Sequence, residues 1–344
     1  MQLLNEYRKL IIKEDSTIKN LIECIELMHS KLAIVVSDND LLIGTISDGD
    51  IRRALLKGLT IDDKIDKLIN KNCIHVEVNK EHLASDLMIK YKIDKIPIID
   101  KNNKLIGCYT SILTNNYPLL ENIFFIMAGG KGVRMRPYTE NCPKPLLPIL
   151  GKPMILHIIE KAKFYGFVKF IISIGYLGEM IQDYLEDGSK FGIHIEYIKE
   201  EVPLGTAGAL GLIKEIPALP FIVTNCDVIS TINYHDILLH HRNNNAEATV
   251  AIKNYQIQNP FGVVVTNENK IVGFEEKPIY HSLINAGVYI FNPKVIELID
   301  KGLPIQMPEF LLTIKDKFNL LNAYLLHEKW NDIGNIHEYN KINE

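Results

Sequence analysis

The sequence predicts an α/β protein in which a smaller α+β domain precedes a larger domain with a mixed, mostly parallel sheet. The first observation is the length of 344 residues, which exceeds what one compact core usually reaches. The second is a strand-turn-strand pattern that occurs twice in the first third of the chain. The third is an alternation of strand-like and helix-like segments after residue 122, which is typical of a parallel sheet covered by helices on both faces.

The first domain is expected over residues 1–118, as two copies at about 1–62 and 63–118. The stretch Ala33–Thr45 aligns with Ile96–Cys108 at a constant offset of 63. Each stretch contains an apolar strand, a polar turn and a second strand that ends in Ile-Gly, and apolar residues at helical spacing precede both. One such unit leaves an apolar face uncovered, and a second copy can cover it face to face.

The second domain is expected over residues 122–344. Its ligand crevice should lie beyond the carboxyl ends of the parallel strands. The predicted strands are Ile123–Met127, Val168–Ile174, Ile193–Ile198, Phe221–Val223, Ala248–Ile252 and Val288–Phe291, with a further one near Ala323–Leu326. Helical spacing occurs at Met154–Phe164, Met180–Leu185 and Ile237–Leu239.

Composition excludes several classes of protein. A hydrophobic content of 47% and a charged content of 23% are ordinary globular values and argue against global disorder. The net charge of −4 argues against a nucleic-acid binder that neutralises phosphates. The five cysteines are scattered singly, which argues against a disulfide framework or a cysteine zinc site. We expect a cytoplasmic protein with no membrane partner, because no signal-peptide core and no long apolar run occurs. The pair His240-His241 is expected to be an exposed helix end.

A glycine-rich segment follows the first strand of the second domain. It reads Ala128-Gly129-Gly130-Lys131-Gly132-Val133-Arg134. Glycines allow backbone N–H groups to approach a triphosphate closely, and an arginine can bind phosphate oxygens with two hydrogen bonds. The segment is neither a P-loop nor the dinucleotide-binding G-x-G-x-x-G pattern. Lys144 follows between two prolines, which restrict the backbone and hold its charge near the loop.

Further short motifs follow in order, and the set resembles the sugar-1-phosphate nucleotidyltransferase family, also called nucleotide-sugar pyrophosphorylases. They are Leu204-Gly205-Thr206-Ala207-Gly208, Asn225-Cys226-Asp227, Phe261-Gly262, Glu276-Lys277-Pro278, Asn285-Ala286-Gly287 and Asn331-Asp332. The resemblance covers residues 122–344 and implies a Rossmann-like sheet. One departure is Val133, where the family commonly has a threonine that could offer one more phosphate contact.

The resemblance also implies a role for each matching residue. Arg134, Lys144 and Asp227 would act on the reacting phosphates, and Asp227 and Asp332 would hold Mg²⁺. Nucleotide binding would fall to Ala128, Gly129, Gly130, Gly132, Gly205, Thr206 and Gly208, and sugar-phosphate binding to Gly262, Glu276, Lys277 and Asn285. The reaction needs no general base, because a phosphate monoester with a second pKa of about 6 is largely ionised at pH 7. It needs charge neutralisation and in-line positioning of two polyanions.

The first domain resembles a tandem CBS domain. Its most specific element is Gly44-x-x-Ser47-x-x-Asp50, which in that family holds adenosine nucleotides. The second copy has Leu113 where the first has Asp50, so at most one site is complete. The alternative is a dimerisation or docking module without a ligand.

The base and the sugar are less well defined by the residues. Guanine presents N–H donors that need an acceptor, which Glu200 or Glu201 could supply. The fusion of a CBS pair to this domain resembles guanylyltransferases of bacterial surface-sugar pathways, most closely the enzyme of legionaminic acid synthesis. We therefore expect a homo-oligomer, a dimer or larger, that converts GTP and α-D-glucosamine 1-phosphate to GDP-glucosamine and diphosphate. Alternatives are a mannose- or heptose-1-phosphate guanylyltransferase, a glucose-1-phosphate thymidylyl- or uridylyltransferase, and a catalytically inactive regulatory subunit.

Overall fold

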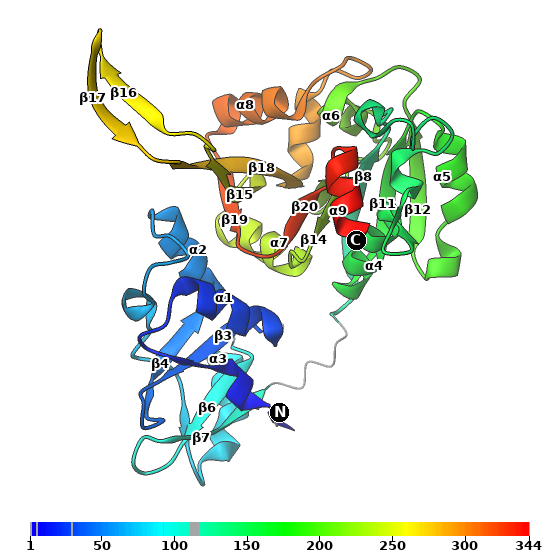
Figure 1. Cartoon of the computed structure of the whole chain (residues 1–344). Helices are drawn as coiled ribbons and strands as arrows, with labels where there is room; N and C mark the ends of the chain where they lie inside the picture. The colour runs from blue at the N-terminus through cyan, green and yellow to red at the C-terminus, as the bar shows by residue number, and fades with distance from the viewer. Residues whose placement is uncertain (1, 5, 29, 92, 111–116, 344) are drawn as a thin grey trace. The chain divides into compact units, whose positions relative to one another are not determined.

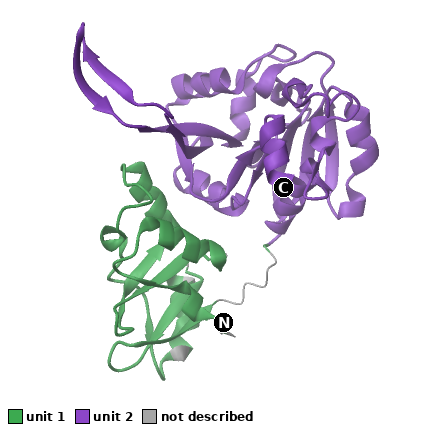
Figure 2. Cartoon of the chain, viewed as in Figure 1, with its two compact units in different colours: residues 1–117 green, residues 118–344 purple. Residues whose placement is uncertain are grey.

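The computed structural model describes residues 2–4, 6–28, 30–91, 93–110 and 117–343. It divides the chain into two compact units, Met1–Tyr117 and Pro118–Glu344, which are coloured separately in Figure 2. Leu113 lies outside the described residues. In the described part of the chain, no helix is long and apolar enough to cross a membrane.

Unit 1 contains the same order of elements twice. The first copy comprises β2 (Ile11–Lys13), α1 (Ile18–Leu27), β3 (Leu32–Val36), β4 (Leu42–Ser47) and α2 (Asp48–Leu56). The second comprises β5 (Val76–Glu77), α3 (Ala84–Tyr91), β6 (Lys95–Ile99) and β7 (Leu105–Thr110), with β1 (Gln2–Leu3) paired to β7. Three short 3-10 helices connect them, at Tyr7–Leu10, Asp66–Leu68 and Glu81–Leu83. Adding 63 to the bounds of β3 and β4 gives those of β6 and β7, so the sequence repeat corresponds to a repeat of the backbone.

The two copies of unit 1 share part of their core. Ile34, Val36 and Leu42 of the first copy form one buried cluster with Ile99 and Leu105 of the second. Each copy also has a cluster of its own, in which a helix packs on its hairpin. The apolar face that a single copy would expose is therefore covered by the other copy.

Unit 2 is built on a seven-stranded sheet in the order β12-β11-β8-β13-β18-β15-β19 (Figure 1). Only β18 runs antiparallel to the other six. The strands are β8 (Leu120–Ala128), β11 (Phe167–Ile174), β12 (His194–Lys199), β13 (Phe221–Asn225), β15 (Ala248–Gln258), β18 (Ile279–Phe291) and β19 (Leu321–Leu326). The predicted α/β class with a mostly parallel sheet is confirmed.

Smaller strand pairs lie outside the main sheet. They are β9 (Pro148–Ile149) with β10 (Lys152–Pro153), β14 (Val228–Ser230) with β20 (Trp330–Asp332), and β16 (Val263–Asn267) with β17 (Lys270–Glu275). The sequence-based prediction did not include the β16–β17 hairpin, which projects from the body of unit 2 (Figure 1).

Helices cover both faces of the main sheet, and successive strand residues alternate between them. Phe124 and Ile172 pack with α4 (Met154–Phe164), α5 (Gly178–Leu185) and α7 (Tyr234–Asn243), whereas Phe125 and Ile171 pack on the opposite face with α6 (Gly205–Gly208) and α8 (Met307–Phe318). This alternation follows from the two-residue period of a strand. The last helix is α9 (Ile336–Asn343), and 3-10 helices lie at Val133–Met135, Lys144–Leu146, Ser189–Phe191, Ala209–Leu212 and Pro293–Leu298.

The expectation for His241 was wrong, because this residue is buried with 1% of its surface exposed. Its Nε2 lies 3.3 Å from Oδ1 of Asn292, and its Nδ1 lies 2.9 Å from Oγ1 of Thr249. The Asn292 amide nitrogen donates to Glu247, so its oxygen accepts from His241. In its neutral form with the proton on Nε2, His241 donates to Asn292 and can accept from the Thr249 hydroxyl at Nδ1. Burial is the main cause that lowers the pKa of His241.

His241 should make the stability of unit 2 fall in mild acid. Because its pKa is lowered in the folded state, the unfolded chain takes up the proton first when the pH falls below about 6.5. The free energy of unfolding should then fall by at most ~1.4 kcal/mol per pH unit from this residue. Urea unfolding followed through Trp330, the single tryptophan, should show a steeper decline between pH 7 and 5 for the parent than for His241→Gln. Equal declines would contradict the assignment.

Candidate active site

The glycine-rich loop and Asp227 lie at the point where the strand order of the sheet reverses. The chain runs from β8 outward through β11 to β12 and then returns to the other side of β8 as β13. The glycine-rich loop follows the carboxyl end of β8, and Asp227 follows the carboxyl end of the adjacent β13. Open α/β sheets bind ligands at such a switch point, and we call this region of unit 2 the crevice.

Gly132 of the glycine-rich loop packs against neighbours that leave little room for a side chain. Gly132 has a φ of +61°, and a Cβ there would lie 3.0 Å from Thr139 and 3.2 Å from Lys144. The Thr139 hydroxyl donates to the Gly132 carbonyl at 2.8 Å. Gly130 has open space instead. Ala128 is the last residue of β8 and its side chain is buried in the core, so only its backbone can face a ligand.

Lys144 and Asp227 form a largely buried ion pair at the mouth of the crevice. Lys144 Nζ lies 2.5 Å from Oδ2 of Asp227, and the two side chains are 9% and 18% exposed. The other carboxylate oxygen, Oδ1, is buried and makes no hydrogen bond to the residues that the structure describes. The burial of this oxygen is therefore not offset by a hydrogen bond within the described residues.

Asp332 is brought beside Asp227 by the pairing of β14 with β20. In that pair Val228 is opposite Asp332, and the Ile333 amide donates to the Asp227 carbonyl at 3.0 Å. Burial and then repulsion by Asp227 raise the pKa of Asp332, whereas Lys144 and Arg134 lower it. The predicted carboxylates, 105 residues apart in sequence, thus influence each other directly.

Arg134 is placed at the same site by a small hydrophobic cluster. Met135 and Ile333, which follow Arg134 and Asp332, are both fully buried in it with Leu147, Met154 and Tyr339. A Cβ on Gly334 would lie 3.6 Å from the Arg134 guanidinium nitrogens. The guanidinium therefore lies against the segment that carries Asp332, and its side chain is exposed toward solvent.

These carboxylates fit a magnesium ion. Mg²⁺ prefers hard oxygen ligands and usually takes one or two protein carboxylates with phosphate oxygens and water. Asp227 Oδ1, which is buried without a hydrogen-bond partner in the described chain, and the adjacent Asp332 carboxylate match that donor set. Within the described residues, no group of three or more His, Cys, Asp or Glu side chains is placed to hold a metal, so phosphate and water would complete the coordination.

Glu200 joins the two predicted nucleotide-binding segments. A Cβ on Gly129 would lie 2.3 Å from Glu200 Oε1, and Oε2 accepts from the Leu204 amide at 3.3 Å. Burial raises the pKa of Glu200, although the Leu204 hydrogen bond opposes the shift. Glu201 is exposed. Of the two glutamates that the sequence offered, only Glu200 lies between the glycine-rich loop and the Gly205 segment.

The Gly205–Gly208 segment packs closely on the start of α8. A Cβ on Gly205, which has a φ of +76°, would lie 2.6 Å from the Ile305 carbonyl oxygen. The Thr206 hydroxyl accepts from the Met307 amide at 2.7 Å and lies 3.3 Å from Oε1 of Gln306. Thr206 therefore has a structural role at the beginning of α8, and Gln306 is an exposed neighbour that the sequence analysis did not identify.

The structure brings only one of the four predicted sugar-binding residues to the crevice. Asn285 Oδ1 accepts from the Gly287 amide, and a Cβ on Gly287 would lie 3.0 Å from the Asn225 side chain, two residues before Asp227. Gly262 and Glu276 lie near each other, but β15 and β18 stay paired from Ile252↔Asn285 to Gln258↔Ile279. Six residues of strand span about 20 Å, so Gly262, Glu276 and Lys277 lie at the far end of this ribbon from Asn285.

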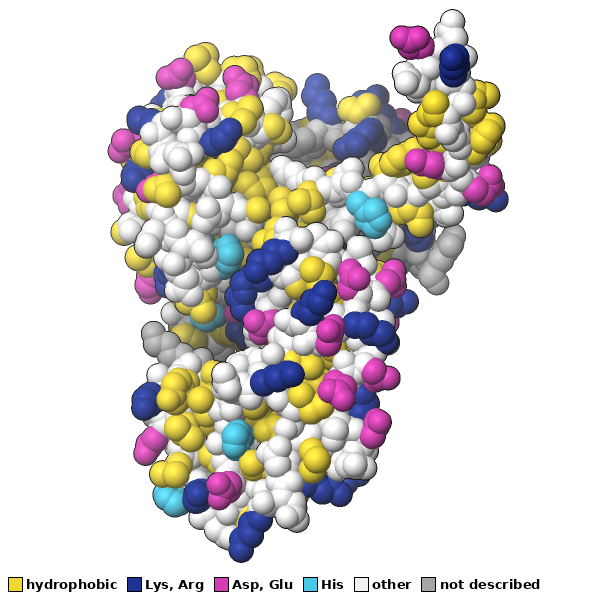
Figure 3. Space-filling view, turned by 90° about the vertical axis from the view of Figure 1, so that its left-hand side faces the viewer, with side chains coloured by type: hydrophobic (Ala, Val, Ile, Leu, Met, Phe, Trp, Pro, Cys, Tyr) yellow, Lys and Arg dark blue, Asp and Glu magenta, His cyan; other side chains and the backbone are white. Residues whose placement is uncertain are grey.

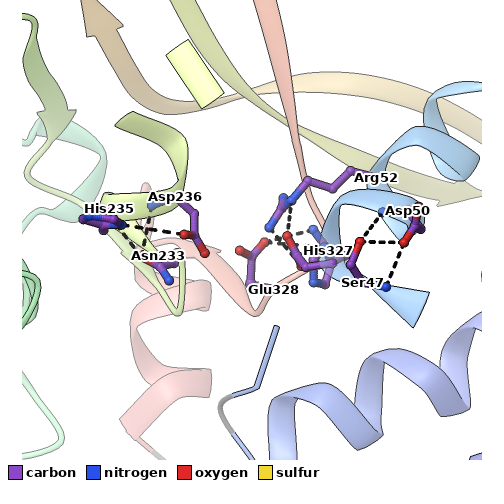
Figure 4. Close-up of polar contacts among 9 residues, drawn as sticks. Ser47, Asp50, Arg52, Asn233, His235, Asp236, His327 and Glu328 are labelled. Carbon is purple, nitrogen blue, oxygen red and sulfur yellow. Dashed lines mark hydrogen bonds and ion pairs between the residues drawn. The ribbon is translucent and has the colours of Figure 1, made fainter. Parts of the chain in front are cut away.

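In unit 1, the predicted nucleotide-binding residues form a helix cap (Figure 4). Ser47 and Asp50 make a capping box at the start of α2, in which the Ser47 hydroxyl donates to Asp50 Oδ2 at 2.5 Å and accepts from the Asp50 amide. Arg53 pairs with the other Asp50 oxygen at 2.6 Å. A Cβ on Gly44 would lie 2.4 Å from the Asn70 carbonyl oxygen, so this glycine is required by backbone packing.

Replacing Lys144 should destabilise unit 2 by leaving Asp227 without its cation. Breaking one partner of a buried pair typically costs ~3–5 kcal/mol, so Lys144→Met should lower the free energy of unfolding by about that amount. Adding Asp227→Asn should recover part of the loss, since the uncompensated charge is gone. Urea titrations of the single and double variants test this.

The matched control for this test is Lys152→Met, which removes an exposed ion pair with Glu160. It should cost no more than about 1 kcal/mol. A Lys144 effect as small as that of Lys152 would contradict the importance of the buried pair.

Two sequence-family models match this chain, one in each unit. The sequence model of the nucleotidyl transferase family matches residues 124–344, and that of the CBS domain matches residues 8–57. The chain is 36% identical over 219 residues to a mannose-1-phosphate guanyltransferase of Gibberella zeae, and 36% identical over 216 residues to mannose-1-phosphate guanylyltransferase catalytic subunit beta of Dictyostelium discoideum. Each match covers 61% of this chain and 60% of the relative.

Solved structures give the same fold. HddC from Yersinia pseudotuberculosis superposes with a TM-score of 0.51 at 26% identity, covering 64% of this chain and 97% of HddC. A Bacillus anthracis protein described as a glucose-1-phosphate thymidylyltransferase superposes with a TM-score of 0.54 at 25% identity, covering 64% and 94%. Because the family model matches residues 124–344, which make up most of unit 2, this chain belongs to the nucleotidyl transferase family.

Proposed function

We propose that the chain is a sugar-1-phosphate guanylyltransferase that converts GTP and a sugar 1-phosphate to a GDP-sugar and diphosphate. The observation that carries this proposal is the convergence of Lys144, Asp227 and Asp332, with Arg134 beside them, at the carboxyl ends of β8 and β13. Two cations and two carboxylates at one crevice suit a reaction between two polyanions.

The reaction requires positioning and charge stabilisation more than proton transfer. An oxygen of the sugar phosphate forms a bond to the α-phosphorus of GTP, while the bond from that phosphorus to the bridging oxygen breaks and diphosphate leaves. Lys144 would stabilise charge at the α-phosphate, and Arg134 would bind the departing diphosphate with two hydrogen bonds. Asp227 and Asp332 would hold Mg²⁺, which supplies charge neutralisation at the phosphates when bound.

The names of the relatives favour mannose 1-phosphate over glucosamine 1-phosphate, which the sequence had suggested first. Two relatives at 36% identity carry mannose-1-phosphate guanyltransferase names. A screen that measures diphosphate release with four NTPs against mannose, glucosamine, heptose and glucose 1-phosphates would distinguish the candidates. Release with UTP or dTTP alone would overturn the guanylyl assignment.

An inactive regulatory subunit is the second candidate, and the intact set of charged residues argues against it. The absence of diphosphate release with every pair, in a folded protein that binds Mn²⁺ and GTP, would establish the regulatory alternative. A CBS pair that serves as a docking module fits either function, because Ser47 and Asp50 satisfy each other in the cap of α2.

Glu200 should select guanine among the bases. A carboxylate accepts from both the ring N–H and the exocyclic amino group of guanine, whereas an amide offers one acceptor only. Glu200→Gln should lower kcat/KM for GTP by about 10- to 100-fold and change any kcat/KM for UTP much less. Glu201→Gln, on the exposed neighbour, is the matched control and should leave both unchanged. Equal losses with GTP and UTP would indicate a structural role instead.

Asp227→Asn and Asp332→Asn should each lower kcat by about 10²–10⁴-fold, comparable to the loss of one strong electrostatic group. If both act through one ion, the double variant should lose little more than the worse single variant. Initial rates at saturating substrates, with Mn²⁺ affinity measured in parallel, test this. If the fold-loss in kcat of the double variant equals the product of the two single losses, a shared metal is refuted.

A further inference from the structure

Asp332 lies beside Asp227 on a short strand pair that has little support of its own. β14 and β20 share three residue pairs, and among the described residues no third strand joins them. An isolated two-stranded pair is marginal in water, so contacts outside the pair must hold it in place. One such contact is made by Trp330 of β20, whose Nε1 donates to the Ala286 carbonyl of β18 at 2.9 Å.

Lys161 of α4 holds the last residue of β14. Its Nζ donates to the Ser230 carbonyl and lies 5.7 Å from the centroid of the Tyr234 ring, within the range of a cation–π contact. Ser230 is opposite Trp330 in the strand pair, and Trp330 is two positions along β20 from Asp332. Lys161 is therefore joined by one hydrogen bond to the strand pair that carries Asp332.

The position of Lys161 is unusual for a lysine. Lysine and arginine side chains are scattered over the face of the molecule in Figure 3, where they are dark blue. The Lys161 amine is instead largely withdrawn from water, and this burial lowers the pKa of Lys161 to about 7, although the Glu328 carboxylate opposes the shift. Burial of a charged amine destabilises a fold, so methionine would suit this position better if only packing were required.

Lys253 of β15 holds the short connection that leads into β20. Its Nζ donates to the His327 carbonyl at 3.2 Å and to the Glu328 carbonyl at 2.7 Å. Next to this contact, the Thr231 amide donates to the Lys329 carbonyl at 2.8 Å and closes the strand pair. Lysines from two different elements thus bind backbone carbonyls on both sides of the same end of the pair.

We propose that Lys161 and Lys253 are positioning residues that hold the β14–β20 pair so that Asp332 stays beside Asp227. The proposal rests on the proposed function, in which Asp332 is a metal ligand. Both lysines bind the end of the pair at Ser230, whereas Asp332 lies at the other end, so they act through the backbone. A displacement of about 1 Å can cost up to about 100-fold in rate, so loose anchoring should be measurable.

The first test follows the fluorescence of Trp330, the single tryptophan, in the full-length protein without nucleotide or metal. Lys161→Met and Lys253→Met should each increase its quenching by acrylamide, because a loosely held strand pair exposes the indole more often. Circular dichroism checks that each variant is folded. Unchanged quenching in either variant would overturn the role of that lysine.

The matched control is Lys163→Met. Lys163 lies on the same helix and also donates to a backbone carbonyl, that of Phe191, which belongs to neither strand of the pair. This variant should quench as the parent does. An increase as large as that of Lys161→Met would show a general loosening of α4 and would overturn the proposal for Lys161.

The second test asks whether the two lysines act through Asp332. The affinity for Mn²⁺ with GTP present, measured by electron paramagnetic resonance of the free ion, should fall in Lys161→Met and in Lys253→Met. In the Asp332→Asn background the same substitutions should cause little further loss, since the group that they position is already altered. In the otherwise unchanged protein, each should lower kcat by about 10-fold with little change in the KM for GTP.

These measurements separate the positioning role from the proposed function. A parent that binds Mn²⁺ and releases no diphosphate with any substrate pair would overturn the function, whereas the quenching and Mn²⁺ comparisons need no turnover. An unchanged Mn²⁺ affinity in the two lysine variants would overturn the positioning role. So would a fold-loss in affinity that is as large in the Asp332→Asn background as in the parent, because the lysines would then act independently of Asp332.

Discussion

The antiparallel pairing of β14 with β20 holds Asp227 and Asp332 side by side. The two carboxylates repel each other, and nearby positive charge must offset this repulsion. Lys144 offsets part of it through a largely buried ion pair with Asp227. Because Oδ1 of Asp227 keeps no partner in the described chain, neutralisation stays incomplete until further positive charge arrives. An incompletely neutralised pair of carboxylates favours a divalent ion that brings phosphate oxygens with it.

The precision of this arrangement comes from packing rather than from the charged residues. Met135, Leu147 and Ile333 each follow close after a charged residue of the site, and all three are buried in one cluster with Tyr339 of α9. The Tyr339 hydroxyl donates to the Pro148 carbonyl at 2.9 Å, which ties the last helix to the segment that follows Lys144. Three segments from distant parts of the sequence are thus fixed relative to one another by a small apolar core.

Sequence reasoning found most of this because the relevant signals are local. The offset of 63 relates the bounds of the two hairpins, the predicted strand Ile123–Met127 lies within β8 (Leu120–Ala128), and the predicted helix Met154–Phe164 has the bounds of α4. His241 was assigned to the exterior because burial of a histidine depends on Thr249 and Asn292, whose proximity no local pattern reveals. The same limit applies to Glu200, since only the fold shows that its carboxylate lies against Gly129 whereas Glu201 is exposed.

Ser47 and Asp50 show why a motif can be read in two ways. A serine and an acidic residue three positions later form a capping box, and the same spacing appears in the CBS nucleotide element. An incoming ligand would therefore have to displace the hydrogen bonds of the cap and the Arg53 ion pair, which stabilise the start of α2 without it.

The position of the β16–β17 hairpin depends on how far β15 and β18 stay paired, which sequence spacing does not determine. Each further residue paired between β15 and β18 moves the hairpin base about 3.3 Å from Asn285, whereas a loop of the same length could fold back toward it. All of residues 279–284 are paired with β15, so Glu276 and Lys277 lie at the outer end of the β15–β18 ribbon, away from Asn285. Those two residues follow the β16–β17 hairpin, whereas Asn285 lies at the start of the buried half of β18, near Asn225. The extent of strand pairing, which the spacing of the motifs does not reveal, therefore determines which predicted sugar-binding residues lie beside Asp227.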